Sequence, residues 1–153
     1  MNKLMLFAAV LLLNMLWLSK ASAFVCTVSA TSVAFGSFSL LTGNTVDSTG
    51  TITISCVLLT PYTITLSPGG SGSYALRRMA NGGNFLYYNL YLDAGYNQIW
   101  GNGTGGSFKV TDSFPLLGGS RDHTVYGRIP LASQRNAMVG SYSDSITVTI
   151  FFL

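Results

Sequence analysis

Apolar and polar residues alternate one by one along most of this chain, and this period of two restricts its fold more than any other feature. In one such segment Ile52, Ile54 and Cys56 fall on one side, with threonine and serine between them. Residues 62–67 and 145–150 repeat the pattern. Because the side chains of a β-strand point alternately to opposite faces, the pattern predicts half-buried strands. Helical periodicity is absent after the N-terminal region, so we expect an all-β protein.

Glycine-rich breaks separate the alternating segments. Pro68-Gly69-Gly70, Asn81-Gly82-Gly83 and Gly118-Gly119 are typical of turns between strands. Many short strands with such turns favour an antiparallel β-sandwich. Residues 84–93 are apolar on both faces, which predicts an interior strand. The expected strands are residues 25–29, 32–38, 50–58, 62–67, 73–79, 85–93, 97–100, 107–112, 122–130 and 141–152.

The last expected strand raises a separate question, because it becomes apolar on both faces at Phe151-Phe152-Leu153. An edge strand of that kind, open to solvent, would invite pairing with another chain. Two arrangements remain open on the sequence alone. The strand is either central in a complete sandwich, or it is covered by something that the chain itself does not supply.

The first 23 residues have the layout of a secretory signal peptide. Lys3 precedes an apolar run over residues 4–18, and Ala21-Ser22-Ala23 forms a small-residue cleavage site. The run is shorter than the roughly 20 residues that span a bilayer. We therefore expect residues 1–23 to be removed and residues 24–153 to form one domain. The mature chain would then be exported to the periplasm, cell surface or medium without a membrane span.

Charge and cysteine content agree with an exported β protein. The whole chain of 153 residues carries +3, and residues 24–153 keep six basic and five acidic side chains, a net charge of +1. Clustered lysine and arginine, which nucleic-acid binding needs, are absent. Cys26 and Cys56 predict one disulfide in an oxidising compartment, the alternative being two buried thiols. Closing such a loop would stabilise the fold by roughly 3–4 kcal/mol.

Signals for catalysis are weak. His123 is the only histidine, and it adjoins Asp122, but neighbours in a strand point to opposite faces and form no catalytic couple. No serine stands in a strand-to-helix elbow, and one histidine with a cysteine pair leaves no metal-ligand cluster. Gly101–Gly106 matches a dinucleotide-binding pattern, but strand-like residues follow it, which favours a hairpin loop. Asn102 begins a glycosylation sequon whose use the sequence leaves open. We expect no enzyme, no cofactor and no metal.

Taken in order, short motifs along the chain resemble the spore coat protein U domain family, which includes subunits of archaic, Csu-type chaperone–usher pili. No single motif is specific, but their order and spacing together are, and they cover nearly all of residues 24–153. The motifs are Cys26-Thr27-Val28, Val33-Ala34-Phe35-Gly36, Ile54-Ser55-Cys56, Arg78-Met79, Leu86-Tyr87-Tyr88-Asn89-Leu90-Tyr91, Ile99-Trp100-Gly101-Asn102-Gly103, Val125-Tyr126-Gly127-Arg128-Ile129-Pro130 and Gly140-Ser141-Tyr142-Ser143-Asp144.

The resemblance implies an incomplete immunoglobulin-like sandwich that lacks its last strand. A periplasmic chaperone would lend a strand first, and the N-terminal arm of a neighbouring pilus subunit would replace it at an outer-membrane usher, which is strand addition to an open groove. Ile146, Val148, Ile150 and Phe152 would lie beside that groove. The sandwich would be unstable alone because the groove is apolar.

The N-terminus departs from the pattern of a shaft subunit, which would carry an arm of alternating apolar residues before its first cysteine. After the expected cleavage only Phe24 and Val25 precede Cys26, too few to cross a domain at about 3.3 Å per residue. We therefore expect a subunit of a pilus or surface coat that accepts a strand without donating one. A place at the fibre tip, with a role in attachment or biofilm formation, would follow.

A different class of function stays open beside this one. The chain would then be a self-sufficient secreted module that binds sugars or hydrophobic surfaces. Its binding loops would be those around Leu58-Leu59 and Gly95–Gly106. This alternative predicts a complete sandwich, whose last strand is paired on both sides.

The signal-peptide prediction has a direct test. N-terminal sequencing of the exported protein should begin at Phe24, because signal peptidase selects the small residues at Ala21 and Ala23. The intact mass should match residues 24–153. A protein that retains residues 4–18 would contradict the prediction.

Overall fold

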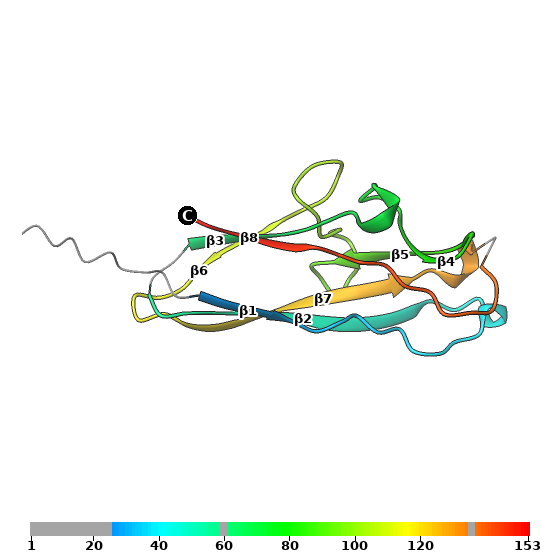
Figure 1. Ribbon diagram of the computed structural model, residues 1–153, viewed down its shortest axis with the longest axis horizontal. Coiled ribbons are helices and arrows are strands. Elements are labelled where there is room, and N and C mark those ends of the chain that lie inside the picture. Colours follow the sequence, from blue (N-terminus) through cyan, green and yellow to red (C-terminus); the bar gives the residue numbers. More distant parts are fainter. Residues whose placement is uncertain (1–25, 59–60, 135–136) are drawn as a thin grey trace, which may run out of the picture.

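Two antiparallel β-sheets face one another in this protein (Figure 1). The computed structural model describes residues 26–58, 61–134 and 137–153. The predicted signal peptide, residues 1–23, lies outside the described residues. Within them the chain forms eight strands and three single-turn 3-10 helices. The all-β sandwich predicted from the alternation is confirmed.

The larger sheet contains five strands and the smaller sheet three. The order in the larger sheet is β1 (Cys26–Ala30), β2 (Val46–Cys56), β7 (Gly119–Ile129), β5 (Asn84–Tyr91) and β4 (Arg77–Asn81). The order in the smaller sheet is β6 (Val110–Ser113), β3 (Pro61–Leu66) and β8 (Val148–Phe152). The short helices are η1 (Leu40–Thr42), η2 (Gly69–Ser71) and η3 (Leu131–Ser133).

The core forms where the alternating apolar rows of the two sheets meet. Ile52 and Ile54 of β2 and Tyr62 and Ile64 of β3 are buried, while their strand neighbours are mostly polar and more exposed. Trp100 fills the space between the layers and donates its indole N–H to the Ile64 carbonyl at 3.3 Å. As the alternation in the sequence predicts, every second side chain of each strand faces the interior between the two sheets.

The structure departs from the expected strands where no neighbour is available to pair. Residues 32–38 form no strand: past the β1–β2 ladder, Val33 and Phe35 pack over Gly127 of β7 instead of continuing the pairing with β2. Residues 97–100 make only isolated bridges, through Ile99 and Trp100. Regular strand geometry in the last segment begins at Val148 rather than at residue 141. Strand-like sequence becomes regular strand only where a partner completes the ladder.

The segment before β8 changes sheets, which explains its irregular backbone. Ser143 exchanges two backbone hydrogen bonds with Ala80 of β4, in the larger sheet. Four residues later the Thr147 carbonyl accepts a hydrogen bond from Ser67, just beyond β3 in the smaller sheet. This crossing connects the two sheets and carries the chain into β8.

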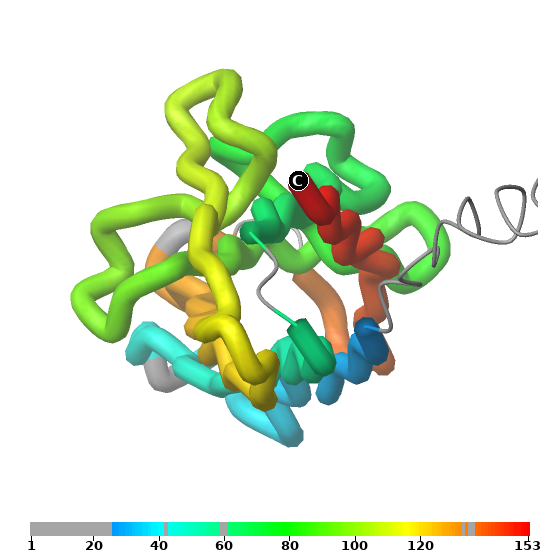
Figure 2. Tube along the Cα trace, turned by 90° about the vertical axis from the view of Figure 1, so that its left-hand side faces the viewer, coloured from blue at the N-terminus to red at the C-terminus, as the bar shows by residue number. Residues whose placement is uncertain are grey.

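β8 lies at the edge of its sheet, paired with β3 alone among the described residues. β1 lies at one edge of the other sheet, paired with β2 alone. Figure 2 views the sandwich from its end and shows β8 (red) and β1 (blue) on the same side of the molecule. Of the two arrangements that the sequence leaves open, the structure has the one in which the last strand is not central.

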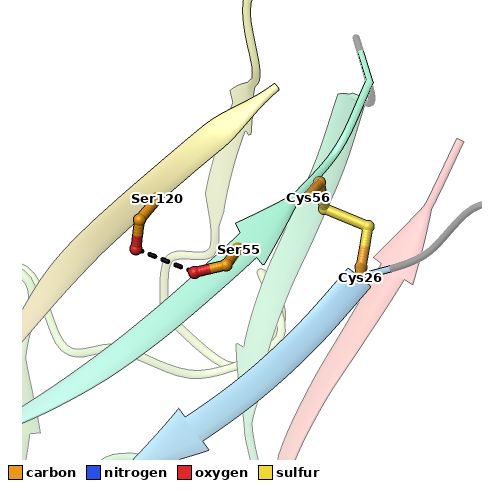
Figure 3. The surroundings of a disulfide bond; sticks show 4 residues. All are labelled: Cys26, Ser55, Cys56 and Ser120. Atoms are coloured by element: carbon orange, nitrogen blue, oxygen red, sulfur yellow. Dashed lines mark hydrogen bonds between the residues drawn. A yellow bond between two sulfur atoms is a disulfide. The ribbon is translucent and has the colours of Figure 1, made fainter. Parts of the chain in front are cut away.

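The predicted disulfide is present, and it joins β1 to β2 within one sheet (Figure 3). Cys26 and Cys56 are direct partners in the ladder, 30 residues apart in the chain. Ser55, next to the bridge, hydrogen bonds to Ser120 of β7 at 2.9 Å. β1 buries little of its own side-chain surface, so the ladder and the disulfide are what hold this edge strand in place.

A buried arginine links the larger sheet to the loops that flank β3. Arg77 has no exposed surface. Its guanidinium donates to the carbonyls of Ser67 and Trp100 and to the Asn89 side-chain oxygen, at 2.7 to 3.2 Å. Burial lowers the pKa of Arg77, which remains far above neutrality because an arginine is always protonated in proteins. The cation is held by three oxygens and not by a carboxylate.

Replacing Arg77 should therefore cost far more than replacing its neighbour. We expect Arg77→Met to lower the free energy of unfolding by about 3 kcal/mol or more, because three buried acceptors lose their donor. Arg78, whose guanidinium stacks on Phe85 at 4.2 Å, is the matched control, and Arg78→Met should cost about 1 kcal/mol or less. Urea denaturation measures both values. Equal effects of the two substitutions would contradict this role for Arg77.

Candidate functional site

An open groove runs along one side of the sandwich, between the unpaired edges of the two sheets. It encloses a cavity of about 450 Å³. The segment 30–35 supplies one wall and the segment 142–148 supplies the other. Core side chains from both sheets, including Ile52, Leu66 and Leu90, form the floor. No strand of the described residues covers the apolar core at this place.

We call residues 142–150 the β8 wall, because this segment leads into β8 and includes its first three residues. The β8 wall presents one row of side chains to the groove. Burial alternates along it, with even-numbered residues half-buried and odd-numbered ones exposed. Ile146 and Val148 line the cavity, and Ile150 packs against the core. Phe152, the fourth residue expected beside a groove, is 42% exposed and does not line the cavity.

Sequence reasoning missed two members of this row, Tyr142 and Asp144, which also line the cavity. The alternation that marks residues 145–150 continues upstream through Ser141, Ser143 and Ser145 on the outer face. Extending the period by four residues would have found both.

Backbone groups on the β8 wall point toward the groove without a strand to receive them. The Thr147 carbonyl accepts from Ser67, and the Leu153 N–H donates to Pro61 at 3.0 Å, so odd-numbered residues bond to the β3 side. Successive residues of a strand direct their N–H and C=O groups to opposite sides. Those of Val148 and Ile150 therefore face the groove, where no described strand pairs with them.

The opposite wall has the same property. Thr31 donates its N–H to the Thr51 carbonyl at 2.9 Å, so the odd-numbered residues of this segment bond to β2. By the same alternation, the backbone groups of Val28 and Ala30 face away from β2, toward the open side. Val28 is 47% exposed, although it is a large aliphatic residue within a strand. Both sheets thus have an unpaired edge strand on the side of this cavity.

A second, larger cavity continues the groove beyond the β8 wall. Its volume is about 1030 Å³, and it lies between the segments 33–41 and 137–142. Val33, Phe35, Met79 and Tyr142 line both cavities, which makes them one continuous surface. The hydroxyl of Tyr142 bonds to the N–H and C=O of Met138, at 2.8 and 2.9 Å, and so fixes the loop that closes this end.

A polar cluster on the other side of the sandwich ties the two sheets together. The Tyr62 hydroxyl of β3 lies 2.8 Å from Nε2 of His123 in β7 and donates to Asp112 at 3.2 Å. Arg121 of β7 pairs with Asp112 of β6 at 3.5 Å. Burial raises the pKa of Tyr62 to about 12, with Asp112 adding to the shift. Burial also lowers the pKa of His123, against the attraction of Asp112.

This cluster gives His123 a structural partner and not a catalytic one. Asp122, its neighbour in sequence, accepts a hydrogen bond from Thr53 at 2.6 Å on the outer face. The two side chains therefore point apart, as the strand geometry predicts. In the described residues, no group of three or more histidine, cysteine, aspartate or glutamate side chains is arranged to hold a metal ion.

Exposed aliphatic side chains gather at the end of the sandwich near the disulfide. The backbone of Gly118 lies directly against Cys56 and Val57, which brings the loop after β6 beside the end of β2. The carboxyl end of β8 reaches the same pole (Figure 1). We call this surface the apolar pole; its exposed residues are Val57, Leu58, Leu116, Leu117 and Leu153.

The second loop considered for binding, Gly95–Gly106, has a different character. Its largest apolar side chain, Trp100, is buried. Asn102 accepts hydrogen bonds from the N–H and hydroxyl of Thr104, at 3.0 and 2.7 Å, which gives a compact polar turn. No large exposed hydrophobic residue comes from this loop. Among the described residues, no helix is long and apolar enough to cross a bilayer.

Solved structures with a similar arrangement come from pili. One is the CsuC–CsuE chaperone–tip adhesion subunit pre-assembly complex from archaic chaperone–usher Csu pili of Acinetobacter baumannii, with a TM-score of 0.59 and 23% identity over 83% of this chain and 39% of that one. Another is the P pilus rod subunit PapA, with a TM-score of 0.56 and 17% identity over 84% of this chain and 99% of that one. The fold is thus of the pilin type, with two antiparallel sheets.

Sequence comparison assigns the family. The Spore Coat Protein U domain profile matches residues 13–149. Protein U of Myxococcus xanthus is 36% identical over 112 residues, which make up 68% of this chain and 59% of that protein. The chain belongs to the Spore Coat Protein U domain family, and it spans about three fifths of the length of this relative. The family resemblance found in the sequence motifs is confirmed.

The cross-sheet cluster predicts how stability depends on pH. Burial lowers the pKa of His123 in the folded chain below its ordinary 6.5. The unfolded chain therefore binds the proton more tightly, and the contribution of His123 to the unfolding free energy is largest above pH 6.5 and decreases as the pH falls below it. Between about pH 7.5 and pH 5, wild type should lose more unfolding free energy than His123→Gln. Glutamine keeps a hydrogen-bond partner for Tyr62 without titrating. Parallel curves for the two proteins would show that His123 contributes nothing to this dependence.

Proposed function

We propose that this chain is an exported structural or adhesive subunit of a chaperone–usher-type fibre or surface coat. It would receive an extended strand from another protein in the groove along the β8 wall. The observation that carries this proposal is the pair of unpaired sheet edges, β1 and β8, together with the open cavity lined by core side chains. Fold and family agree with it, since similar structures come from pili.

An inserted strand would both pair the free backbone groups of the groove and fill its apolar cavity. Its backbone would pair with the free N–H and C=O groups of the β8 wall, and its alternate side chains would cover the core. From Tyr142 to Ile150 the wall measures about 26 Å, at roughly 3.3 Å per residue. A donor of at least nine residues is therefore needed. The side chains of Ile146, Val148 and Ile150 would lie beside it, while Phe152 would lie past its end.

The proposed partners rest on a similar solved structure. CsuE was solved together with a chaperone, CsuC. We propose that a periplasmic chaperone likewise covers this groove before assembly at an outer-membrane usher, and that a neighbouring subunit then supplies the strand. The exposed apolar surface on β8, including Phe151, needs such protection, because unpaired apolar edges aggregate.

The place of this chain in the fibre rests on the predicted signal peptide. Cleavage after Ala23 would leave Phe24 and Val25 before Cys26, which joins the disulfide at the start of β1. A subunit processed in this way would receive a strand without donating one. That role suits the tip of a fibre, with a function in attachment or biofilm formation.

A second candidate function draws on the apolar pole. Leu117 is 90% exposed and Leu116 is 72% exposed, although both are aliphatic. Such a patch suits contact with a hydrophobic surface. As a self-sufficient module, the protein would use this pole for binding and would be stable without any donor. The polar Gly95–Gly106 loop adds nothing to this surface.

The groove proposal predicts a sharp difference between neighbouring residues of β8. Val148→Asp places a charge on the groove side, whereas Thr149→Asp places one on the exposed face. An apolar–polar alternating peptide, added during refolding of the exported chain, should raise the melting temperature of wild type and Thr149→Asp by about 10 °C or more. Val148→Asp should show little or no rise.

Two results would contradict the groove proposal. One is a wild-type protein that is monomeric, fully folded and unaffected by any alternating peptide, which would favour the self-sufficient module. The other is an equal response of the Val148 and Thr149 variants. Circular dichroism of each variant without peptide controls for a failure of Val148→Asp to fold.

A further inference from the structure

One charged side chain stands in the groove. Among the described residues that line either cavity, Asp144 is the one with a formal charge at neutral pH. It belongs to the inward row of the β8 wall, between Tyr142 and Ile146. The remaining groove-facing members of that row are apolar or aromatic. One inward-facing position of a donor strand would therefore lie opposite the carboxylate of Asp144.

The hydrogen bonds of Asp144 fix where the carboxylate lies and leave it able to accept more. Oδ1 accepts the N–H groups of Gly70 and Ser145, both at 2.9 Å. Oδ2 accepts the hydroxyl of Tyr88 at 2.8 Å. A carboxylate offers about four acceptor positions, so these three bonds leave one on Oδ2, the oxygen nearest to Gly69. Gly69 packs so closely against Asp144 that a Cβ there would collide with the carboxylate.

No neighbouring cation takes that remaining position. Arg77 lies beneath the groove and attracts Asp144 through space. Its N–H groups, however, donate to Ser67, Asn89 and Trp100. The other ionisable side chains that line the cavities, Tyr88 and Tyr142, are neutral at pH 7. The groove therefore presents a single negative charge to whatever enters it.

We propose that the strand accepted by this groove carries lysine or arginine at the inward position that faces Asp144. Its other inward side chains are apolar, and the one next to Asp144 on the Tyr142 side is bulky, because it enters the cavity of about 1030 Å³. The partner is thus an extended arm with one cation inside an apolar alternation. This inference rests on the proposed function of the groove.

The physical reason is the cost of covering a charge. An inserted strand removes water from Asp144, and an apolar side chain above it would leave a desolvated carboxylate with an unused acceptor position. An acidic side chain would add repulsion at short range. A lysine or arginine replaces the lost water with a charge-assisted hydrogen bond. The carboxylate then sets the register of the arm, because a slip by one inward step would bury both charges unpaired.

The test uses synthetic strands and the full exported chain. Alternating peptides with five inward positions carry lysine, leucine or glutamate at the position facing Asp144, and a fourth peptide moves the lysine one step, to face Ile146. Each is made in both chain directions, since either direction keeps the spacing. Affinity is measured on wild type, on Asp144→Asn, and on Asp122→Asn, whose carboxylate lies on the outer face bound to Thr53.

On wild type the lysine peptide should bind roughly tenfold or more tightly than both the glutamate peptide and the displaced-lysine peptide. Asparagine keeps an acceptor for Tyr88 without the charge, so Asp144→Asn should reduce the lysine-over-glutamate ratio to about twofold or less. Asp122→Asn should keep the wild-type ratio.

Three outcomes separate the inference from the proposal beneath it. If all peptides bind wild type equally, or leucine binds best, the groove accepts strands but Asp144 does not select them. If no alternating peptide binds, the proposed function itself fails. If Asp144→Asn does not fold, the inference is tested on wild type alone, by comparing the peptide whose lysine faces Asp144 with the peptide whose lysine faces Ile146. Equal binding of these two peptides overturns the inference.

Discussion

The unpaired edge of β8 is the constraint on which the rest of this structure depends. A β-strand carries a backbone donor and acceptor at every residue, and a sandwich is complete only when both of its open edges are paired, covered or made unattractive. Here β8 bonds to β3 on one side and to no described strand on the other. It carries no charged residue that would discourage pairing. The cavity of about 450 Å³ lies beside this unpaired edge and is lined by Val148 of β8.

The opposite side of the sandwich is closed by polar contacts instead of a strand. Tyr62 reaches from β3 to His123 of β7, and Arg121 reaches from β7 to Asp112 of β6. These contacts hold the sheets together where the edge strand β6 is only four residues long. The disulfide, by contrast, joins two strands of one sheet. The two sheets are thus joined by polar side-chain contacts on the β6 side and have an open groove on the β8 side.

Asp144 connects the fold to the proposed site. Its carboxylate holds the turn at η2 through Gly70 and the interior of the larger sheet through Tyr88. The same residue forms part of the groove lining. One side chain therefore positions the β8 wall and gives it its charge. Asp144 is thus needed for the fold itself, and under our proposal it also selects the partner strand.

Much of the fold was predictable because alternation is a local signal. The rows of β2, β3 and β8 fall where residues 51–56, 62–67 and 145–150 place them, and Cys26 and Cys56 form the predicted disulfide. Ile146 and Val148, which the same alternation places on the inward face, line the cavity. Period two assigns each residue to a face without knowledge of its neighbours.

The rest was decided by tertiary contacts that no local pattern contains. Residues 32–38 look like a strand but form no ladder, and the segment around Ser143 looks like part of β8 but crosses from one sheet to the other. Arg77 becomes a core residue only because carbonyls of distant loops converge on it. By itself, the sequence determined which residues face inward, since alternation is a property of the chain. Only the tertiary structure decided which edges stay unpaired, because pairing depends on what lies beside each strand in space.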